Sequence, residues 1–276
     1  MTLRVLTQNF RKSTIIETKA SRMWSARLPF MVQHLKKVNP AVVGAQEATV
    51  SQCDDIMRLF PNWTYAGGVK HGNVPIFWDT LRLRAEEDTL LERIYPSGER
   101  ERYATLIRLQ HRTLAWGGWF GSIHLAANGD DEPNSVHLRA VQMRAIVDDF
   151  TAWITAHPHP EDDKPNLIVC GDLNDNLGDN TGLLGDNAGV RRIAYNHGGW
   201  KSLRRRLPLG KISGDTLRSF NGWHSTTSLP HDSKAIDEIF TSGVALEDAA
   251  LRRTCTDVLG SWASDHNSYA ADIIIN

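Results

Sequence analysis

Side chains suited to metal binding and proton transfer stand at several points where β-strands are expected to begin or end. In chain order they are Asn9, Gln46, Glu47, His124, Asp172, Asn174, Asp237, Asp265 and His266. Carboxylate and carboxamide oxygens suit Mg²⁺ or Mn²⁺, and an imidazole can stabilise or protonate a phosphate oxygen. Because strand ends are rigid, groups from different strands can converge on one rim of the sheets and form a preorganised site.

Each of these residues also has a simpler structural explanation when it is taken alone. Asn9 can be a turn residue, and Glu47 can begin a helix because Glu is favoured in a first turn. Residues 171–174 have the composition of a turn, and Asp265 can cap or turn the chain. His124 follows an apolar strand, where a core histidine is the common case. Only the whole set, in this order along the chain, favours a functional site.

The strands and helices that must position these residues alternate irregularly along the chain. Hydrophobic patterning predicts strands at residues 3–8, 41–45, 73–78, 81–91, 103–109, 114–124, 166–170, 235–241, 251–258 and 268–275. Helices are predicted at residues 26–38 and 50–60 and, most strongly, between Ser135 and His157. Residues 175–234 are expected to be loop-rich with short helices. With no repeat or linker, we expect one domain over residues 1–276, built from mixed sheets and too irregular for an eight-unit barrel.

The overall composition is that of a folded protein and limits the classes of function. The 276 residues include 31 Lys and Arg against 32 Asp and Glu, a net charge of −1, and 41% are hydrophobic. Disorder is excluded, and no apolar run approaches the ~18 residues of a membrane span. The first residues lack the apolar segment of a signal peptide, so we expect a cytoplasmic protein. The near-zero charge means that any site for a polyanion must be local.

The three cysteines give no sign of a disulfide framework or a zinc site. Cys53, Cys170 and Cys255 are widely spaced and form no CxxC pair. We expect them to be small buried residues, and Cys170, inside an apolar run, fits this interpretation best.

Taken together, the polar residues at the strand ends resemble a known family. The motifs are Gln8-Asn9, Gln46-Glu47, His124-Leu125, Gly171-Asp172-Leu173-Asn174, Ile236-Asp237 and Ser264-Asp265-His266. This series, which spans residues 3–275, resembles the endonuclease/exonuclease/phosphatase superfamily, to which deoxyribonuclease I and exonuclease III belong. Arg139-Ala140-Val141-Gln142 is similar to the family's Arg-x-x-Gln. The resemblance implies an α/β fold, a four-layer sandwich of two packed mixed β-sheets flanked by helices.

The resemblance also implies a divalent metal site that holds Mg²⁺ or Mn²⁺. The residue that matches Glu47 is the family's principal metal ligand. Those that match Asn9 and Asp265 lie in or beside the metal shell. We therefore expect these three residues to form the metal centre.

The remaining motif residues match the catalytic positions of the family. The resemblance implies that Asp172 orients or deprotonates the attacking water and that Asn174 assists it. It implies that His266 contacts the phosphate and is oriented by Asp237. His124 would donate to a phosphate oxygen or to the leaving group. The expected reaction is in-line attack of water on phosphorus while charge on the oxygens is offset.

Two departures from the family pattern concern groups that would assist these residues. Ala235 stands where the family frequently has Arg before Ile-Asp. Residues 71–73 contain no acid that could orient His124 as a Glu does in deoxyribonuclease I. The partner that orients His124 is therefore left open by the sequence.

A basic segment in the second half of the chain favours a nucleic-acid substrate. Between Val190 and Gly214 lie seven Lys and Arg residues and no acid. The candidate substrate-binding residues in and near this segment are Arg191, Arg192, Trp200, Arg204, Arg205 and Trp223. They could follow a phosphate backbone and stack on a base. The alternative is a solvated helix face whose Trp packs into the core.

The sequence thus predicts a metal-dependent phosphodiester hydrolase, a nuclease that acts on DNA. Within the same class, the alternative is a phosphatase or phosphodiesterase acting on a small or lipid phosphoester. In a different class, the alternative is a catalytically inactive binding module of the same fold, which the retention of all the central positions argues against. Neither a membrane nor an obligate protein partner is expected.

Overall fold

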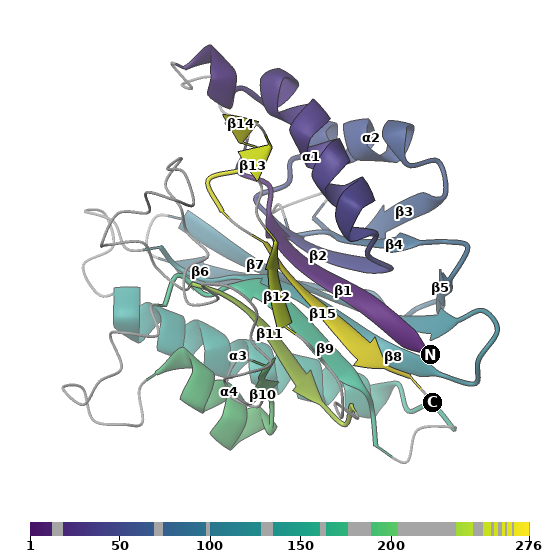
Figure 1. Cartoon of the computed structure of the whole chain (residues 1–276). Helices are drawn as coiled ribbons and strands as arrows, with labels where there is room; N and C mark the ends of the chain where they lie inside the picture. Colours follow the sequence, from purple (N-terminus) through teal and green to yellow (C-terminus); the bar gives the residue numbers. More distant parts are fainter. Residues whose placement is uncertain are drawn as a thin grey trace.

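Two mixed β-sheets form the centre of the structure (Figure 1). The computed structural model describes residues 1–12, 19–68, 74–97, 100–127, 135–160, 164–175, 189–203, 236–244, 251–254, 257–258, 261–262, 264–266 and 268–275. In the first sheet the strand order is β12 (Leu251–Thr254), β15 (Ser268–Ile274), β1 (Thr2–Asn9), β2 (Val42–Gln46), β4 (Ile76–Asp79) and β3 (Trp63–Ala66). Strand β1 runs parallel to β2 and antiparallel to β15, so the sheet is mixed.

The second sheet has the same mixed character. Its strand order is β10 (Lys201–Ser202), β11 (Asp237–Ser242), β9 (Leu167–Asp172), β8 (Gly117–His124), β7 (Arg100–His111) and β5 (Leu83–Ala85), and β6 (Leu91–Ser97) also pairs with β7. Strands β8 and β9 are parallel, whereas β9 and β11 are antiparallel. A separate two-stranded ribbon is formed by β13 (Asp257–Val258) and β14 (Ser261–Trp262).

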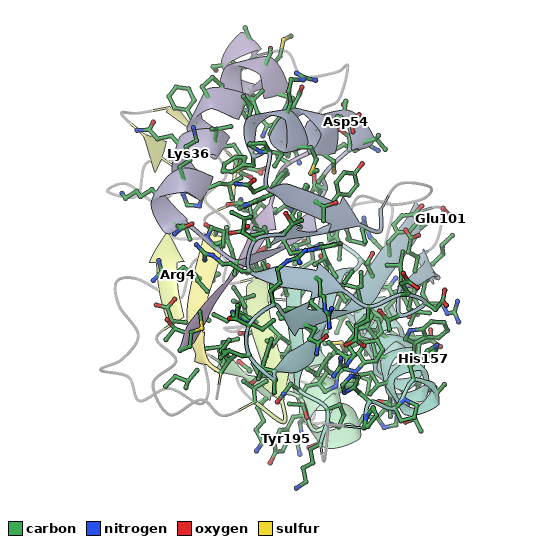
Figure 2. The ribbon with its side chains drawn as sticks, turned by 90° about the vertical axis from the view of Figure 1, so that its right-hand side faces the viewer. Arg4, Lys36, Asp54, Glu101, His157 and Tyr195 are labelled. Carbon is green, nitrogen blue, oxygen red and sulfur yellow. The ribbon has the colours of Figure 1, made fainter. Side chains whose placement is uncertain are left out.

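Helices cover the outer face of each sheet (Figure 1). They are α1 (Trp24–Val38) and α2 (Val50–Leu59) on the first sheet, and α3 (Ser135–Ala156) and α4 (Val190–Gly198) on the second. A short 3₁₀ turn, η1 (Ala20–Arg22), precedes α1. In Figure 2, Lys36 of α1 and Asp54 of α2 lie at one end of the view, and Tyr195 of α4 lies at the other. The order of layers is therefore helix, sheet, sheet, helix.

Three apolar clusters occupy the spaces between these four layers. Val5 of β1 and Phe120 of β8 belong to the cluster between the sheets. Leu6, the next residue of β1, points to the opposite face and joins the cluster with α1 and α2. Trp119, next to Phe120, joins the cluster with α3 and α4. Successive strand residues face opposite sides, so both faces of each sheet are buried.

Helix termini next to the sheets have clear sequence causes. Thr49 caps α2 in a capping box, since its side chain accepts from Gln52 N and its own N–H donates to the Gln52 side chain. Helix α1 ends at Asn39, which takes the left-handed conformation with φ 51°. These two boundaries set where β2 begins and where the chain turns away after Glu47.

The fold predicted from the sequence, two packed mixed sheets flanked by helices, is confirmed. The expected strand at residues 81–91 is wrong, because the chain turns at residues 86–90, where Asp88 has φ 58°, and separates β5 from β6. Strand β3 was not predicted, since its four residues alternate too briefly to give a pattern. Within the described residues, no helix has the length and apolar character needed to cross a membrane.

Candidate active site

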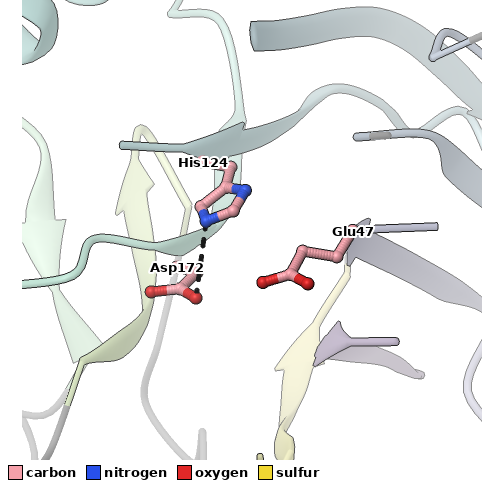
Figure 3. A group of neighbouring side chains, drawn as sticks. All are labelled: Glu47, His124 and Asp172. Carbon is pink, nitrogen blue, oxygen red and sulfur yellow. Dashed lines mark ion pairs between the residues drawn. The ribbon is translucent and has the colours of Figure 1, made fainter. Parts of the chain in front are cut away.

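Strand register brings the polar residues from the strand ends together. In the first sheet Asn9 is the Cα partner of Gln46, so Glu47 follows directly beside the end of β1. In the second sheet Asp172 is the partner of His124 on one side and of Asp237 on the other. Figure 3 shows Glu47 facing His124 and Asp172 across the space between the two sheets.

Asp172 lies at the centre of this group and is 1% exposed. Its Oδ2 accepts a hydrogen bond of 3.0 Å from Nδ2 of Asn9, and its Oδ1 accepts one of 3.0 Å from the backbone N–H of Asn174. The same Oδ2 lies 3.8 Å from Nε2 of His124 and 3.8 Å from Nε2 of His266. Burial, together with the neighbouring Asp237 carboxylate, raises the pKa of Asp172 above its ordinary value.

His266 is held in a defined orientation by two contacts. Its Nδ1 lies 2.9 Å from Oδ2 of Asp237, and its backbone N–H donates to Oγ of Ser264 at 3.2 Å. Ser264 Oγ in turn donates to the backbone oxygen of Asn9 at 2.7 Å. Burial opposes a charged ring, but the carboxylates of Asp237 and Asp172 outweigh it and raise the pKa of His266 to about 10. The ring therefore faces the site as an imidazolium.

Glu47 takes the left-handed conformation, with φ 55°, at the turn after β2. Its Oε1 accepts from Nδ2 of Asn9 at 3.2 Å, and its Oε2 accepts from the backbone N–H of Lys12 at 3.0 Å. Burial acts to raise the pKa of Glu47, but His124, the Lys12 N–H and His266 outweigh it and lower that pKa to about 2. Glu47 is thus an ionised carboxylate inside the site.

His124 differs from His266 in its protonation. Burial lowers the pKa of His124 to about 4, so its ring is neutral near pH 7. Its Cα partner on β7 is Tyr103, and no hydrogen bond to a carboxylate orients the ring in the part of the chain that the structure describes. The site therefore combines one neutral and one charged imidazole around a single carboxylate.

The donor set fits a hard divalent cation. Among the described residues, two groups have ligand atoms that all lie within 4.8 Å of one another: Glu47, His124 and Asp172, and Asp172, Asp237 and His266. The first group pairs two carboxylates from opposite sheets, which is the oxygen-rich chemistry that Mg²⁺ and Mn²⁺ favour. Glu47 and Asp172 are therefore the residues that would hold a metal.

The two other predicted metal residues take different positions. Asn9 turns its NH₂ group toward Glu47 and Asp172, and its Oδ1 accepts from the backbone N–H of Arg11 at 2.8 Å. Asp265 lies with Oδ2 at 3.7 Å from Nε of Arg11. Asn9 thus links the two carboxylates in this arrangement, and a role for Asn9 or Asp265 as a ligand stays a prediction.

Two residues expected to bind substrate are instead buried, and these predictions are corrected. Arg191 is 2% exposed and pairs with Glu238, with 2.9 Å between Nε and Oε2. Trp200 is also 2% exposed, and its ring packs against Phe150 and Phe240, with centroids 5.8 and 6.2 Å away. Neither side chain can contact a phosphate backbone or a base from these positions.

The other candidates for substrate binding stay predictions. Arg192 is half-buried on α4. Arg204, Arg205 and Trp223 lie outside the described residues. The basic segment is therefore not a continuous exposed surface, because Arg191 and Trp200 are buried.

Sequence reasoning missed the residues that shape the turn after β1. Arg27 of α1 is 1% exposed, and its guanidinium donates to the backbone oxygens of Phe10 and Arg11 at 2.7 and 2.8 Å. Gln52 of α2 donates to the same Arg11 oxygen at 3.1 Å. These contacts hold the turn whose Lys12 N–H caps Glu47. No motif marks them, because each looks like an ordinary polar residue of an amphipathic helix.

Comparison with solved structures identifies the fold of this chain. A crystal structure of an endonuclease/exonuclease/phosphatase family protein from Bacteroides thetaiotaomicron superposes with a TM-score of 0.75 at 16% identity, covering 99% of this chain and 98% of that one. This chain has the endonuclease/exonuclease/phosphatase fold. No family model matches the sequence, and no curated protein matches it either.

Other structures with this fold have named activities. The mannosyl-6-phosphatase Bt3783 of Bacteroides thetaiotaomicron has a TM-score of 0.74 at 16% identity over 99% of this chain and 100% of that chain. The TDP2 of D. rerio, solved with a single-strand DNA product, has a TM-score of 0.68 at 17% identity over 99% of both chains. Proteins with this fold therefore include a phosphatase and a protein bound to DNA.

Proposed function

We propose that this chain is a divalent-metal-dependent phosphoester hydrolase that activates water for in-line attack on phosphorus. The observation that supports this most is the meeting of Glu47, His124 and His266, from separate strands, around the buried carboxylate of Asp172. Glu47 and Asp172 would hold the cation, and Mg²⁺ or Mn²⁺ bound there would offset charge on the phosphate oxygens. The endonuclease/exonuclease/phosphatase fold agrees with this chemistry.

Three side chains of the site would have separate roles, which follow from their charges and positions. Asp172, fixed by Asn9 and by the Asn174 N–H, is placed to orient the attacking water beside the cation. His266, charged and oriented by Asp237, is placed to bind a phosphate oxygen. His124, neutral, sits on the other side of Asp172 and can donate a hydrogen bond to a phosphate oxygen or to the leaving group.

The substrate that we propose first is a phosphodiester of DNA. The D. rerio protein with this fold holds a DNA product. Arg11, whose side chain is 41% exposed, and the exposed Lys12 stand at the turn beside Glu47 and can contact a phosphate backbone. Arg192 can add a further cation from α4.

A sugar phosphomonoester is the second candidate substrate. The mannosyl-6-phosphatase superposes on this chain over its whole length. The burial of Arg191 and Trp200 removes two of the groups that a long polyanion would use. A small substrate needs only the groups around Asp172 and the cations at Arg11 and Lys12.

One panel of substrates separates these possibilities. Purified protein is incubated with Mg²⁺ or EDTA and supercoiled plasmid, linear duplex, single-stranded DNA, RNA, p-nitrophenyl phosphate and mannose 6-phosphate. EDTA-sensitive nicking of plasmid supports an endonuclease, whereas turnover of the monoesters alone supports the phosphatase. Lack of hydrolysis of any substrate, with metal bound, contradicts the proposed hydrolase and supports a binding module.

A further inference from the structure

The buried arginine at the start of α4 contacts both segments that carry the catalytic carboxylates. Nε of Arg191 donates to Oε2 of Glu238 at 2.9 Å, and Nη1 donates to the backbone oxygen of Asp175 at 3.0 Å. Nη1 also lies 3.4 Å from Oδ2 of Asp175. The three side chains are 2%, 0% and 7% exposed, so the ion pairs are shielded from water.

Glu238 connects this arginine to the strand of Asp237. The two acids are neighbours on β11, so their side chains point to opposite faces of the sheet. Asp237 faces His266, and Glu238 faces α4, where Ser202 of β10 also donates to Oε2 at 2.9 Å. The ion pair between Arg191 and Glu238 therefore holds β11 on the sheet face opposite to Asp237, at the next residue along the strand.

Asp175 connects the same arginine to the loop of Asp172. Asn174, the residue before Asp175, takes the left-handed conformation with φ 50°. Its backbone N–H donates to Oδ1 of Asp172, and its Nδ2 donates to the backbone oxygen of Leu125. A shift of Asp175 would move Asn174, and with it the hydrogen bond that sets the carboxylate of Asp172.

We propose that Arg191 is a positioning residue that locks the loop of Asp172 and Asn174 to the strand of Asp237 through one guanidinium. The planar fork of arginine can bond Glu238 and Asp175 together. A lysine ammonium is a single point charge at the end of a flexible chain and cannot hold both in this geometry. Arg191→Lys keeps the charge that Glu238 needs but loses the link between the two segments.

The test compares Arg191→Lys with Arg108→Lys, a matched control. Arg108 is another buried arginine, 1% exposed and paired with Glu86. Arg108 lies on β7, where its Cα partner on β8 is Trp119. Trp119 is five residues from His124 along β8, a distance of roughly 17 Å at the usual rise of a strand. Both variants replace a buried, ion-paired arginine, but only Arg191 contacts the catalytic segments.

Two readouts are measured on each variant. Hydrogen exchange in metal-free protein should be at least about tenfold faster at residues 173–175 in Arg191→Lys and unchanged there in Arg108→Lys. The kcat for p-nitrophenyl phosphate or bis(p-nitrophenyl) phosphate, corrected for folded protein, should fall at least about tenfold in Arg191→Lys only. KM should stay within about threefold of wild type, because Arg11 and Lys12 are not held by this arginine. The Mg²⁺ concentration for half-maximal activity should rise, because Asp172 is one of the two residues that would hold the cation.

The second readout rests on the proposed function, and the first does not. A wild-type protein without activity contradicts the hydrolase, while the exchange measurement still tests the positioning role. Unchanged exchange at residues 173–175, a kcat within twofold of wild type, or an equal loss in Arg108→Lys overturns the proposal. If Arg191→Lys fails to fold, the double variant Arg191→Met/Glu238→Met, which removes both charges of the most deeply buried ion pair, is measured by the same criteria.

Discussion

The imidazole of His266 contacts the carboxylate of Asp237, with 2.9 Å between Nδ1 and Oδ2. This contact fixes the ring so that its other nitrogen, Nε2, lies 3.8 Å from Oδ2 of Asp172. A carboxylate on Nδ1 sets both the orientation and the protonation of the ring. The activity that we propose therefore depends on Asp237, although its carboxylate is hydrogen-bonded to His266 on the side of the ring away from Asp172 Oδ2.

Replacing Asp237 by Asn should lower kcat by about 100-fold or more. The amide is similar in size but carries no charge to hold the imidazolium, and proton-transfer and charge-stabilising groups contribute about 10²–10⁴-fold. The measurement is steady-state hydrolysis by Asp237→Asn with saturating Mg²⁺.

A second His–Asp pair provides the control for this prediction. Nε2 of His197 lies 2.8 Å from Oδ1 of Asp148 on the exposed surface between α4 and α3. Asp148→Asn breaks a contact of the same chemistry and should keep wild-type kcat. If Asp237→Asn is as active as Asp148→Asn, the orienting role is wrong.

Replacing Glu47 by Gln should weaken Mg²⁺ and Mn²⁺ binding at least tenfold. Glu47 is ionised, and the neutral amide removes one of the two carboxylates that face the cation. Isothermal calorimetry on EDTA-treated and dialysed protein measures the affinity without any substrate. Glu87→Gln, at an exposed position away from the site, should bind as wild type does. Equal affinity in the two variants would contradict a metal site at Glu47.

His111 should make the fold less stable as the solution becomes acidic. Its ring is 6% exposed, and Nδ1 accepts from the backbone N–H groups of Thr113 and Leu114 at 3.2 Å each. Burial lowers the pKa of His111, so below about pH 6.5 the unfolded chain takes up this proton more readily than the folded one. The stability that the neutral ring contributes is present above pH 6.5 and is lost as pH falls through the folded-state pKa.

Urea unfolding of wild type and His111→Asn at pH 7.5 and pH 5.5 measures this effect. Other titrating groups cancel in the comparison, so the free energy of unfolding should drop more with acid in wild type than in the variant. An equal drop in both proteins would show that His111 does not contribute to the pH dependence.

The close approach of the two sheets should make Gly44 of β2 intolerant of a side chain. A Cβ at this position would lie 2.3 Å from Cβ of Cys170 on β9. Gly44→Ala should therefore cost about 1–3 kcal/mol in free energy of unfolding, by overpacking. Cys170→Gly in the same chain removes the opposing Cβ, and part of the loss should return. A double variant no more stable than Gly44→Ala would place the strain elsewhere.

The sequence predicted which polar residues meet at the strand ends better than it predicted the segments between the strands. Asn9, His124 and Asp172 end strands whose apolar character is clear in the sequence, and the parallel register of β1 with β2 and β8 with β9 brings such ends together. The expectation of His266 next to Asp237 agrees with the observed contact. Strand β3 and the turn at Asp88 depend on short local runs, which pattern alone cannot resolve.

Substrate-binding residues were harder to predict, because the charge of a side chain does not reveal whether it points into the protein or toward the solvent. Arg191 and Arg192 are adjacent and identical in type, yet one is buried and the other half-exposed. The difference comes from Glu238, which is far along the chain and meets Arg191 only because β11 lies behind α4. In the same way, Trp200 is a core residue because Phe150 and Phe240 surround it.

The role proposed for Asp172, activation of water in a metal-dependent hydrolase, can be tested by comparing wild type with one variant. Wild type and Asp172→Asn are assayed at equal folded concentration with p-nitrophenyl phosphate and bis(p-nitrophenyl) phosphate, with Mg²⁺ and with EDTA. We expect turnover by wild type, loss of that turnover in EDTA, and at least about 100-fold lower kcat in a normally folded Asp172→Asn. Near-wild-type turnover by the variant, or hydrolysis that persists in EDTA, would contradict it.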